Sequence, residues 1–360
     1  MRKKILAAIT AGLIAFGSFG MVDAMPRDQI AKIQVKKAKD FKFWTTDSVA
    51  NKKLVEYVTD VTNKKSKNFI PVEDRLAVFD MDGTFICETA PCYFEWMLYL
   101  ERALYDENYT PSPEDRAYAQ MVESEIRADH FMTGKFPKGI DIGEAKSQES
   151  VFAGMTVKDY EAYVKNFMNK PVEGLTNLKW GEAFYLPMVE VIKYLQANDF
   201  KVYVVTGSDR PAMRVMASEL LKIPTNQIIG TNPDIRAVNQ GDVSADNYVY
   251  RHDDYLIRGQ LTQKNLKMNK VVAIEHEIGK QPVLAFGNSS GDTSMLNYAI
   301  TGNKYKSLGF FVICDDLERE LGNEKKAAGC VKLADNNGWI KISMRDDFKT
   351  IYGDNVKRSE

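Results

Sequence analysis

Short runs of apolar residues recur along the chain, and each run ends at small or polar residues. The runs are Leu76–Phe79, Val202–Val205, Val283–Phe286 and Leu308–Ile313. Short apolar runs of this kind are typical of strands that are buried on both faces of a parallel sheet. The residues that follow them are therefore expected at one edge of that sheet, where open α/β folds bind ligands.

Between these runs, apolar residues recur at the spacing of helices. Segments 49–61, 188–197 and 211–221 show this amphipathic pattern, which predicts helices that pack one face on a core. The stretch between the first two apolar runs also has helical periodicity and many aromatic residues. Within it, Pro137–Gly143 contains several helix breakers and predicts a loop.

One region departs from both patterns. Gln227–Gly230 predicts a short strand, and the stretch Asp234–Gln263 mixes Tyr and Val with Asn, Asp and Gly. This mixture predicts a hairpin or an irregular excursion. The alternation of strands and helices over most of the chain predicts an α/β fold.

The most informative residues follow the first apolar run. Asp80 and Asp82 stand two positions apart, and Gly83 comes next. In extended chain the two carboxylates would share a face, and the glycine lets the backbone turn sharply. One carboxylate could then act as a nucleophile and the other as a proton donor, beside a hard metal ion. Taken alone, the motif also fits an acidic turn without chemistry.

Three later motifs favour the chemical interpretation. The second apolar run is followed by Thr206 and Gly207. A lysine-bearing segment, Lys267–Ile274, has the pattern of a helix start. The third apolar run leads into a glycine-containing turn that carries Asn288 and Asp292.

Together, these motifs resemble those of the haloacid dehalogenase (HAD) superfamily, and specifically its phosphatases. They also resemble an exported bacterial branch with phosphoserine phosphatase-like or phosphorylcholine phosphatase-like domains. The resemblance implies an α/β fold with a Rossmann-like core, a parallel sheet and an inserted helical cap of the C1 type. It places the core at residues 76–86 and 198–350, the cap at 87–197, and an N-terminal helical arm at 25–75.

The resemblance also implies a role for each motif residue. Asp80 would attack phosphorus, and Asp82 would protonate the leaving oxygen and later activate water. Thr206 would bind the phosphoryl group, with Gly207 beside it. The implied cofactor is Mg²⁺, held by Asp80, Asp82 through its carbonyl, Asn288 and Asp292.

Three positions leave alternatives open. The pattern of the exported relatives maps the phosphate-binding lysine onto Lys270, whereas phosphoserine phosphatase-like spacing favours Lys267. Asn288 stands where the family often has aspartate, but its amide oxygen can still bind Mg²⁺ directly or through water. Glu88 stands where the resembled phosphatases place a substrate contact, and a carboxylate favoured by a helix start is the alternative.

The N-terminus has the form of a secretory signal peptide. Basic residues at positions 2–4 precede an apolar segment that ends near Phe19, and Ala24 offers a small residue for cleavage. We therefore predict removal of residues 1–24 and release into the periplasm or the medium, with an uncleaved membrane anchor as the alternative. No later stretch is long and apolar enough to span a membrane.

Composition and charge limit the classes of partner that are expected for this chain. The chain of 360 residues has a formal net charge of −1, which gives no basic footprint for nucleic acid. Its length predicts two compact units. In an exported protein, oxidation of the four cysteines is possible, and the local pairings are Cys87 with Cys92 and Cys314 with Cys330. The connectivity and the oligomeric state stay open.

The predicted function is Mg²⁺-dependent hydrolysis of a small phosphorylated metabolite through an aspartyl-phosphate intermediate. Two alternatives stay open at this point. A phosphotransferase or phosphomutase would pass the same phosphoryl group to a second hydroxyl group. A non-catalytic exported binding protein would keep the fold without turnover, and Asn288 is the feature that allows it.

Overall fold

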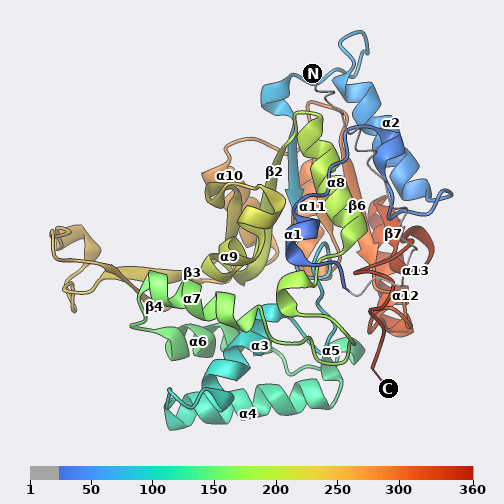
Figure 1. Cartoon of the computed structure of the whole chain (residues 1–360). Coiled ribbons are helices and arrows are strands. Elements are labelled where there is room, and N and C mark those ends of the chain that lie inside the picture. The colour runs from blue at the N-terminus through green and yellow to red at the C-terminus, as the bar shows by residue number, and fades with distance from the viewer. Residues whose placement is uncertain (1–23, 360) are drawn as a thin grey trace, which may run out of the picture.

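The computed structural model describes residues 24–359 and has a seven-stranded sheet at its centre, with helices on both faces (Figure 1). The strand order is β4-β3-β2-β1-β5-β6-β7, and all neighbours are parallel except β3 and β4. The predicted α/β class with a mainly parallel sheet is confirmed. The strands are β1 Leu76–Phe79, β2 Lys201–Asp209, β3 Ile228–Ala237, β4 Leu256–Gln263, β5 Leu284–Gly287, β6 Leu308–Ile313 and β7 Ile340–Ser343.

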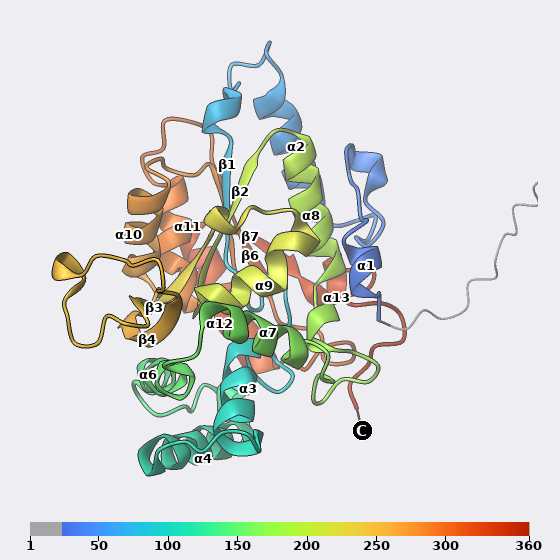
Figure 2. The same cartoon turned by 60° about the vertical axis from the view of Figure 1, so that its left-hand side comes forward.

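Helices cover the two faces of the sheet because alternate strand residues face opposite sides. Phe79 and Phe286 belong to one apolar cluster together with α8 and α9, whereas Val78 and Ala285 belong to a second cluster with α10, α11 and α12. Figure 2 shows these two layers. The core helices are α8 Leu186–Ala197, α9 Arg210–Leu221, α10 Met268–Glu277, α11 Thr293–Ile300 and α12 Glu324–Asn337.

A second group of helices lies beyond one edge of the sheet, at the bottom of Figure 1. Its core is aromatic: the rings of Phe94 and Trp180 meet edge to face, as do those of Phe152 and Tyr160. The division into arm, core and cap stays a prediction; α8, which the predicted cap range includes, packs against β2. The helices of this group are α3 Phe94–Leu100, α4 Pro113–Arg127, α5 His130–Thr133, α6 Ile140–Phe152 and α7 Val157–Phe167.

The N-terminal and C-terminal segments pack beside the sheet. The amphipathic segment 49–61 forms α2, Val49–Thr62, and its buried side joins the same cluster as α8 and α9. Trp44 pairs with Phe348 as an isolated bridge, which ties the two ends of the chain together. The remaining short helices are α1 Arg27–Ile30 and α13 Met344–Asp347.

Two local predictions need correction. The predicted loop Pro137–Gly143 is wrong from Ile140 onward, because α6 begins there after Gly139 in the left-handed conformation. Glycine suits position 143 of this helix because a larger residue would have no room there: a Cβ atom would lie 2.0 Å from the Tyr118 hydroxyl oxygen. Tertiary packing thus outweighs the low helix propensity of glycine. The short strand predicted to end at Gly230 continues as β3 to Ala237.

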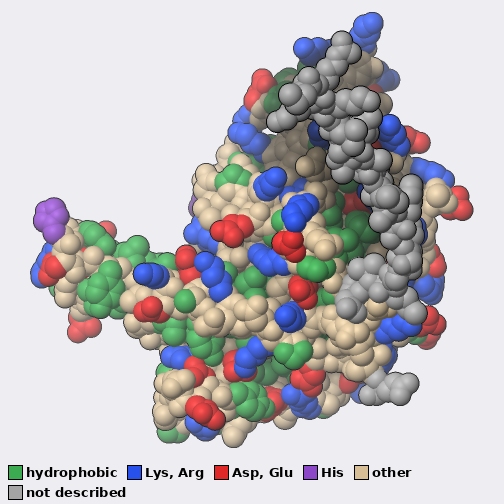
Figure 3. Space-filling model, in the orientation of Figure 1, with side chains coloured by type: hydrophobic (Ala, Val, Ile, Leu, Met, Phe, Trp, Pro, Cys, Tyr) green, Lys and Arg blue, Asp and Glu red, His purple; other side chains and the backbone are tan. Residues whose placement is uncertain are grey.

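The predicted hairpin is confirmed. Strands β3 and β4 pair in antiparallel register, and the hairpin projects from the body of the molecule (Figures 1 and 3). The hairpin exposes apolar side chains, including Val249, which is 82% exposed, and Tyr250. On the rest of the face in Figure 3, lysine and arginine side chains are interspersed with acidic ones.

The remaining sequence predictions concern the N-terminus and the cysteines. The predicted signal peptide lies outside the described residues except for Ala24. Within residues 24–359, no helix is both long and apolar enough to cross a membrane. All four cysteines are buried free thiols in this structure, although Cys314 and Cys330 are in hydrogen-bond contact with each other.

Candidate active site

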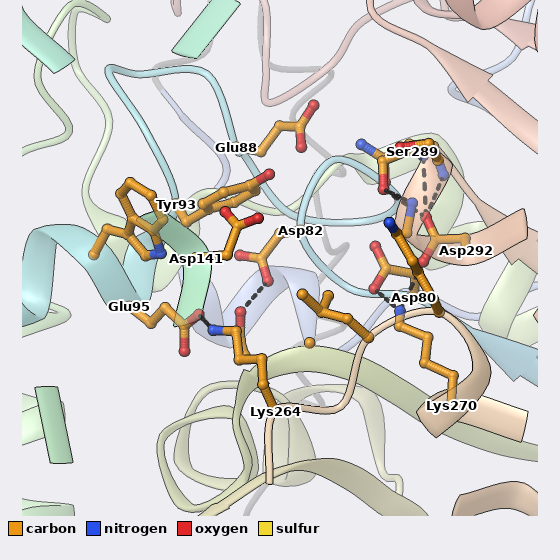
Figure 4. A pocket seen from close by; sticks show the side chains of 18 residues that line it. Asp80, Asp82, Glu88, Tyr93, Glu95, Asp141, Lys264, Lys270, Ser289 and Asp292 are labelled. Carbon is orange, nitrogen blue, oxygen red and sulfur yellow. Dashed lines mark hydrogen bonds and ion pairs between the residues drawn. The ribbon is translucent and has the colours of Figure 1, made fainter. Parts of the chain in front are cut away.

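A cavity of about 280 Å³ lies between the carboxyl edge of the sheet and the helical group (Figure 4). One side, called here the core side, consists of the C-terminal end of β2, of residues that follow β1, β4 and β5, and of the start of α10. The other side, called here the cap side, contains Glu88, Tyr93, Glu95, Trp96 and Asp141. The cavity therefore joins the two parts of the fold at the edge where parallel sheets bind ligands.

A tight turn after β1 positions the first two carboxylates. The Asp80 amide still donates to Phe286 of β5, at 2.9 Å, so Asp80 stands at the end of the sheet. Gly83 then adopts φ +72°, and a Cβ atom there would lie 2.0 Å from Nδ2 of Asn288 and 2.4 Å from Cδ of Glu88. Only glycine fits this close approach. Asp80 and Asp82 are both lining residues of the cavity.

Lys270 lies between two of the predicted carboxylates. Its Nζ atom is 2.6 Å from Oδ1 of Asp80 and 2.7 Å from Oδ1 of Asp292. Lys270 is in the first turn of α10, and its side chain is almost fully buried. Lys267 also lines the cavity, but it precedes the helix with φ +53°. Of the two candidate lysines, Lys270 is thus the one that contacts Asp80.

The electrostatics of the cavity follow from burial and crowding. Burial, and then the nearby Asp292, raise the pKa of Asp80 to about 7, although Lys270 opposes this shift. Burial, and then the charge of Asp80, raise the pKa of Asp82 well above its usual value. Burial disfavours the ammonium of Lys270, but Asp292 and Asp80 outweigh it and raise the pKa of that lysine. The site therefore favours a protonated Asp82 and a charged Lys270.

The turn after β5 brings further oxygen atoms to Asp80. Oδ2 of Asp292 accepts from the backbone amides of Asn288 and Ser289, at 3.1 and 3.0 Å. The Thr84 hydroxyl lies 3.2 Å from Oδ2 of Asp80 and 3.3 Å from Oδ1 of Asn288, so it links the two loops.

These atoms have the chemistry of a magnesium site. Among residues 24–359, no group of three or more His, Cys, Asp or Glu side chains is arranged to hold a metal ion. Such groups do not count the side-chain amide oxygen of Asn288 or the backbone carbonyl of Asp82. Both are hard oxygen donors that suit Mg²⁺. Two buried carboxylates, Asp80 and Asp292, share the single charge of Lys270, which leaves negative charge for a cation to balance. The donor set therefore fits the ion.

The residues at the C-terminal end of β2 lie differently from the prediction. Thr206 is 0% exposed, does not line the cavity, and accepts a hydrogen bond from the Ser208 amide through its hydroxyl oxygen, at 3.0 Å. The register of β2 against β3 shifts between Val205 and Asp209. Gly207 and Ser208 line the cavity, and the Ser208 hydroxyl donates to Oδ2 of Asp82 at 2.7 Å. Ser208 was missed; a hydroxyl residue directly after the glycine is the only sequence signal for it.

The cap side contains both predicted and missed residues. Glu88 lines the cavity and pairs with Lys326 at 2.6 Å, and it precedes the start of α3 by several residues, so the helix-start alternative is wrong. Glu95 accepts from Lys264 at 2.9 Å and from the Asp209 amide at 2.6 Å. Glu95 and Asp141 were missed, because each stands in a helix without a local motif.

The fold and the cavity define a class: an α/β protein with buried carboxylates and a lysine at the carboxyl edge of its sheet, beneath a helical group. Residues 77–297 match the model of the haloacid dehalogenase-like hydrolase family, and the chain belongs to this family. No curated protein matches the chain.

Several solved structures resemble this one. A conserved functionally unknown protein from Anaerococcus prevotii DSM 20548 has 13% identity and a TM-score of 0.52, over 86% of this chain and 94% of that one. Cytosolic 5'-nucleotidase IIIB bound to cytidine has 11% identity and a TM-score of 0.46, over 82% and 86%. A phosphoserine phosphohydrolase-like protein from Francisella tularensis subsp. tularensis SCHU S4 has 15% identity and a TM-score of 0.37, over 66% and 87%. At these identities, the first likeness supports the fold alone.

Proposed function

We propose that the protein hydrolyses a small phosphomonoester through a phosphoryl group held covalently on Asp80. One observation supports this most directly: Lys270 contacts both Asp80 and Asp292 inside a cavity that also contains Asp82. A carboxylate nucleophile needs nearby positive charge before an anionic phosphate can approach it. Lys270 supplies such charge at the nucleophile itself.

The reaction would proceed in two displacements. A carboxylate oxygen of Asp80 attacks phosphorus, the bond to the leaving oxygen breaks, and Asp82 gives that oxygen a proton. Asp82, now ionised, takes a proton from water, which attacks phosphorus and restores Asp80. The burial that raises the pKa of Asp82 keeps it protonated for the first displacement.

The proposal includes Mg²⁺ as the cofactor. Asp80, Asp292, the amide oxygen of Asn288 and the backbone carbonyl of Asp82 would hold it. When bound, the ion supplies positive charge beside the phosphoryl oxygens. Gly83 allows the close approach of the β1 turn to Asn288 that such a shared site needs.

A substrate screen tests this proposal. Purified protein with Mg²⁺ should release inorganic phosphate from at least one member of a panel of sugar, amino-acid, choline and nucleotide monoesters. Asp80→Asn is the matching inactive variant. Asp47→Asn makes the same change on a fully exposed side chain and should keep wild-type activity. No phosphate release from any ester, by a folded protein, would contradict the proposal.

We also propose that the protein is exported, on the pattern of residues 2–24 alone. Phosphate esters cross membranes poorly because they are charged, so an exported phosphatase would release a more easily imported product. Mass spectrometry of the protein from its native host should find Met25 as the first residue. An intact Met1 in the membrane fraction would replace export with anchoring.

A further inference from the structure

We propose that Ser208 is a positioning residue that determines which oxygen of Asp82 gives the proton to the leaving group. This inference rests on the proposed function, because it assigns a role within that reaction. Ser208 lies in the part of β2 where the register against β3 shifts.

The two oxygens of Asp82 have different surroundings. Oδ2 accepts a hydrogen bond from the Ser208 hydroxyl at 2.7 Å. Oδ1 is buried and has no hydrogen-bond partner among residues 24–359. Figure 4 shows this contact on one oxygen of Asp82, while the other oxygen points away from it, toward the cap side. The carboxyl group is therefore held at one end only.

Ser208 is itself held firmly enough to act in this way. Its backbone amide donates to the Thr206 hydroxyl at 3.0 Å, and the next amide, of Asp209, donates to Glu95 at 2.6 Å. Ser208 as a whole is only 4% exposed. The hydroxyl group therefore approaches Asp82 from a fixed backbone position.

The chemistry follows from the single proton of the hydroxyl group. When Ser208 donates to Oδ2, a proton on the carboxyl group belongs on Oδ1, the free oxygen. In the first displacement, the Oδ1–H bond breaks, the proton joins the leaving oxygen, and the electron pair of the broken P–O bond stays on that oxygen. Asp82 is left as a carboxylate whose Oδ2 still accepts from Ser208.

Without this contact, the carboxyl group would lose its orientation. The terminal torsion of aspartate is broad and roughly two-fold, so either oxygen could then turn toward the leaving group. Oδ1 has no partner that would restrain it. Proton transfer would be slower because fewer encounters have the required geometry.

The leaving group of the substrate provides the test. An alkyl phosphate needs the proton as its P–O bond breaks, whereas the weakly basic 2,4-dinitrophenolate leaves 2,4-dinitrophenyl phosphate readily without it. Ser208→Ala should therefore lower kcat/KM for an alkyl ester by about 10- to 100-fold, within the range of general acid catalysis. It should lower kcat/KM for the dinitrophenyl ester by about threefold at most, because the departure of dinitrophenolate does not need a proton from Asp82.

Two controls separate positioning from a general structural effect. Ser208→Thr keeps the hydroxyl group and should restore most of the alkyl-ester activity. Ser218→Ala removes a hydroxyl group on α9 that donates to a backbone carbonyl outside the cavity, and should change neither ester. If Ser208→Ala does not fold, Ser208→Cys, with its weak donor, takes its place with the same expectation.

An equal loss for both esters, or no loss for either, would overturn the role of Ser208 while the wild-type enzyme still hydrolyses them. A failure of Ser208→Thr to recover activity would also overturn it. If the wild-type protein hydrolyses neither ester nor any of the screened substrates, the proposed function itself fails, and this inference fails with it.

Discussion

The two sides of the cavity differ in how firmly their side chains are held. On the core side, Asp80 and Asp292 share Lys270, and Asp292 also accepts two backbone amides. On the cap side, Glu88 and Glu95 are also buried and ion-paired, whereas Asp141 is exposed and Tyr93 is only partly buried. The core side thus has the rigidity that bond breaking needs, whereas Asp141 and Tyr93 give part of the cap side the freedom expected of a surface that selects the leaving group.

This contrast follows from the elements that form each side. The core residues leave parallel strands whose positions the whole sheet determines. The cap residues belong to α3, to α6 and to the loop before α3, and they meet the core through side-chain pairs such as Glu95 with Lys264. Substitutions on the core side should therefore lower the rate for every substrate, and those on the cap side should change the choice among substrates.

Replacing the nucleophile should have the largest effect. Asp80→Asn should reduce kcat by about 10⁴-fold or more, because a neutral amide cannot form the acyl phosphate. The measurement is steady-state hydrolysis of p-nitrophenyl phosphate, with circular dichroism to verify folding. Near wild-type turnover by this variant would assign the chemistry to another residue.

Removal of the metal should have the next largest effect. A chelator should abolish activity and Mg²⁺ should restore it, whereas Ca²⁺ should inhibit, because it prefers a larger and looser shell of oxygen ligands. Asp292→Ala should raise the Mg²⁺ concentration needed for half-maximal rate, and Asn288→Asp should lower it or leave it unchanged. Titration of activity with Mg²⁺ measures both. Full activity in the chelated protein would reject magnesium as the cofactor.

The two candidate lysines should differ in effect. Lys270→Met removes the ammonium that contacts Asp80 and should lower kcat by about 10²- to 10³-fold. Lys267→Met should lower it by about tenfold at most, because a charge farther from the nucleophile acts more weakly. Kinetics of the two variants on one ester decide between them. A greater loss from Lys267→Met would reverse the assignment.

The smallest effect is expected on the cap side. Asp141→Asn should change KM by a few-fold (about 0.5–1 kcal/mol in binding) and leave kcat nearly unchanged, since this exposed carboxylate is expected to contact the leaving group alone. The size and sign of the change should differ between esters with cationic and neutral leaving groups. A uniform loss of kcat across esters would mean that Asp141 acts like the core-side residues, and it would contradict the proposed difference between the two sides.

The sequence was sufficient for the core side outside β2 because the motifs there are local. Asp80, Asp82, Asn288 and Asp292 each follow an apolar run within a few residues, so the strand pattern alone locates them at one edge. Lys270 needed the family pattern in addition, because three lysines stand close together around the start of the helix. Strands β1, β2, β5 and β6 were predictable from such local patterns, whereas β7 was not predicted.

The rest of the site was not predictable in this way. On the cap side, Glu95 meets Lys264 across 169 positions of sequence, and no periodicity encodes such a pair. On the core side, Ser208 was missed because it lies where the register of β2 against β3 shifts, and no local pattern encodes that shift. The start of α6 was missed because Gly139 and Gly143 suggest a loop, while the packing of Tyr118 over Gly143 supports a helix.

The central claim is that Asp80 holds the phosphoryl group during turnover, and trapping that intermediate tests it most directly. Asp82→Asn should slow the water step, so the variant mixed with 2,4-dinitrophenyl phosphate and quenched in acid should accumulate phosphoenzyme. Mass spectrometry should then find one phosphoryl group, on the peptide that contains Asp80, and borohydride reduction should convert that residue to homoserine. An unmodified Asp80 peptide, or a phosphoryl group on any other residue, would contradict the account.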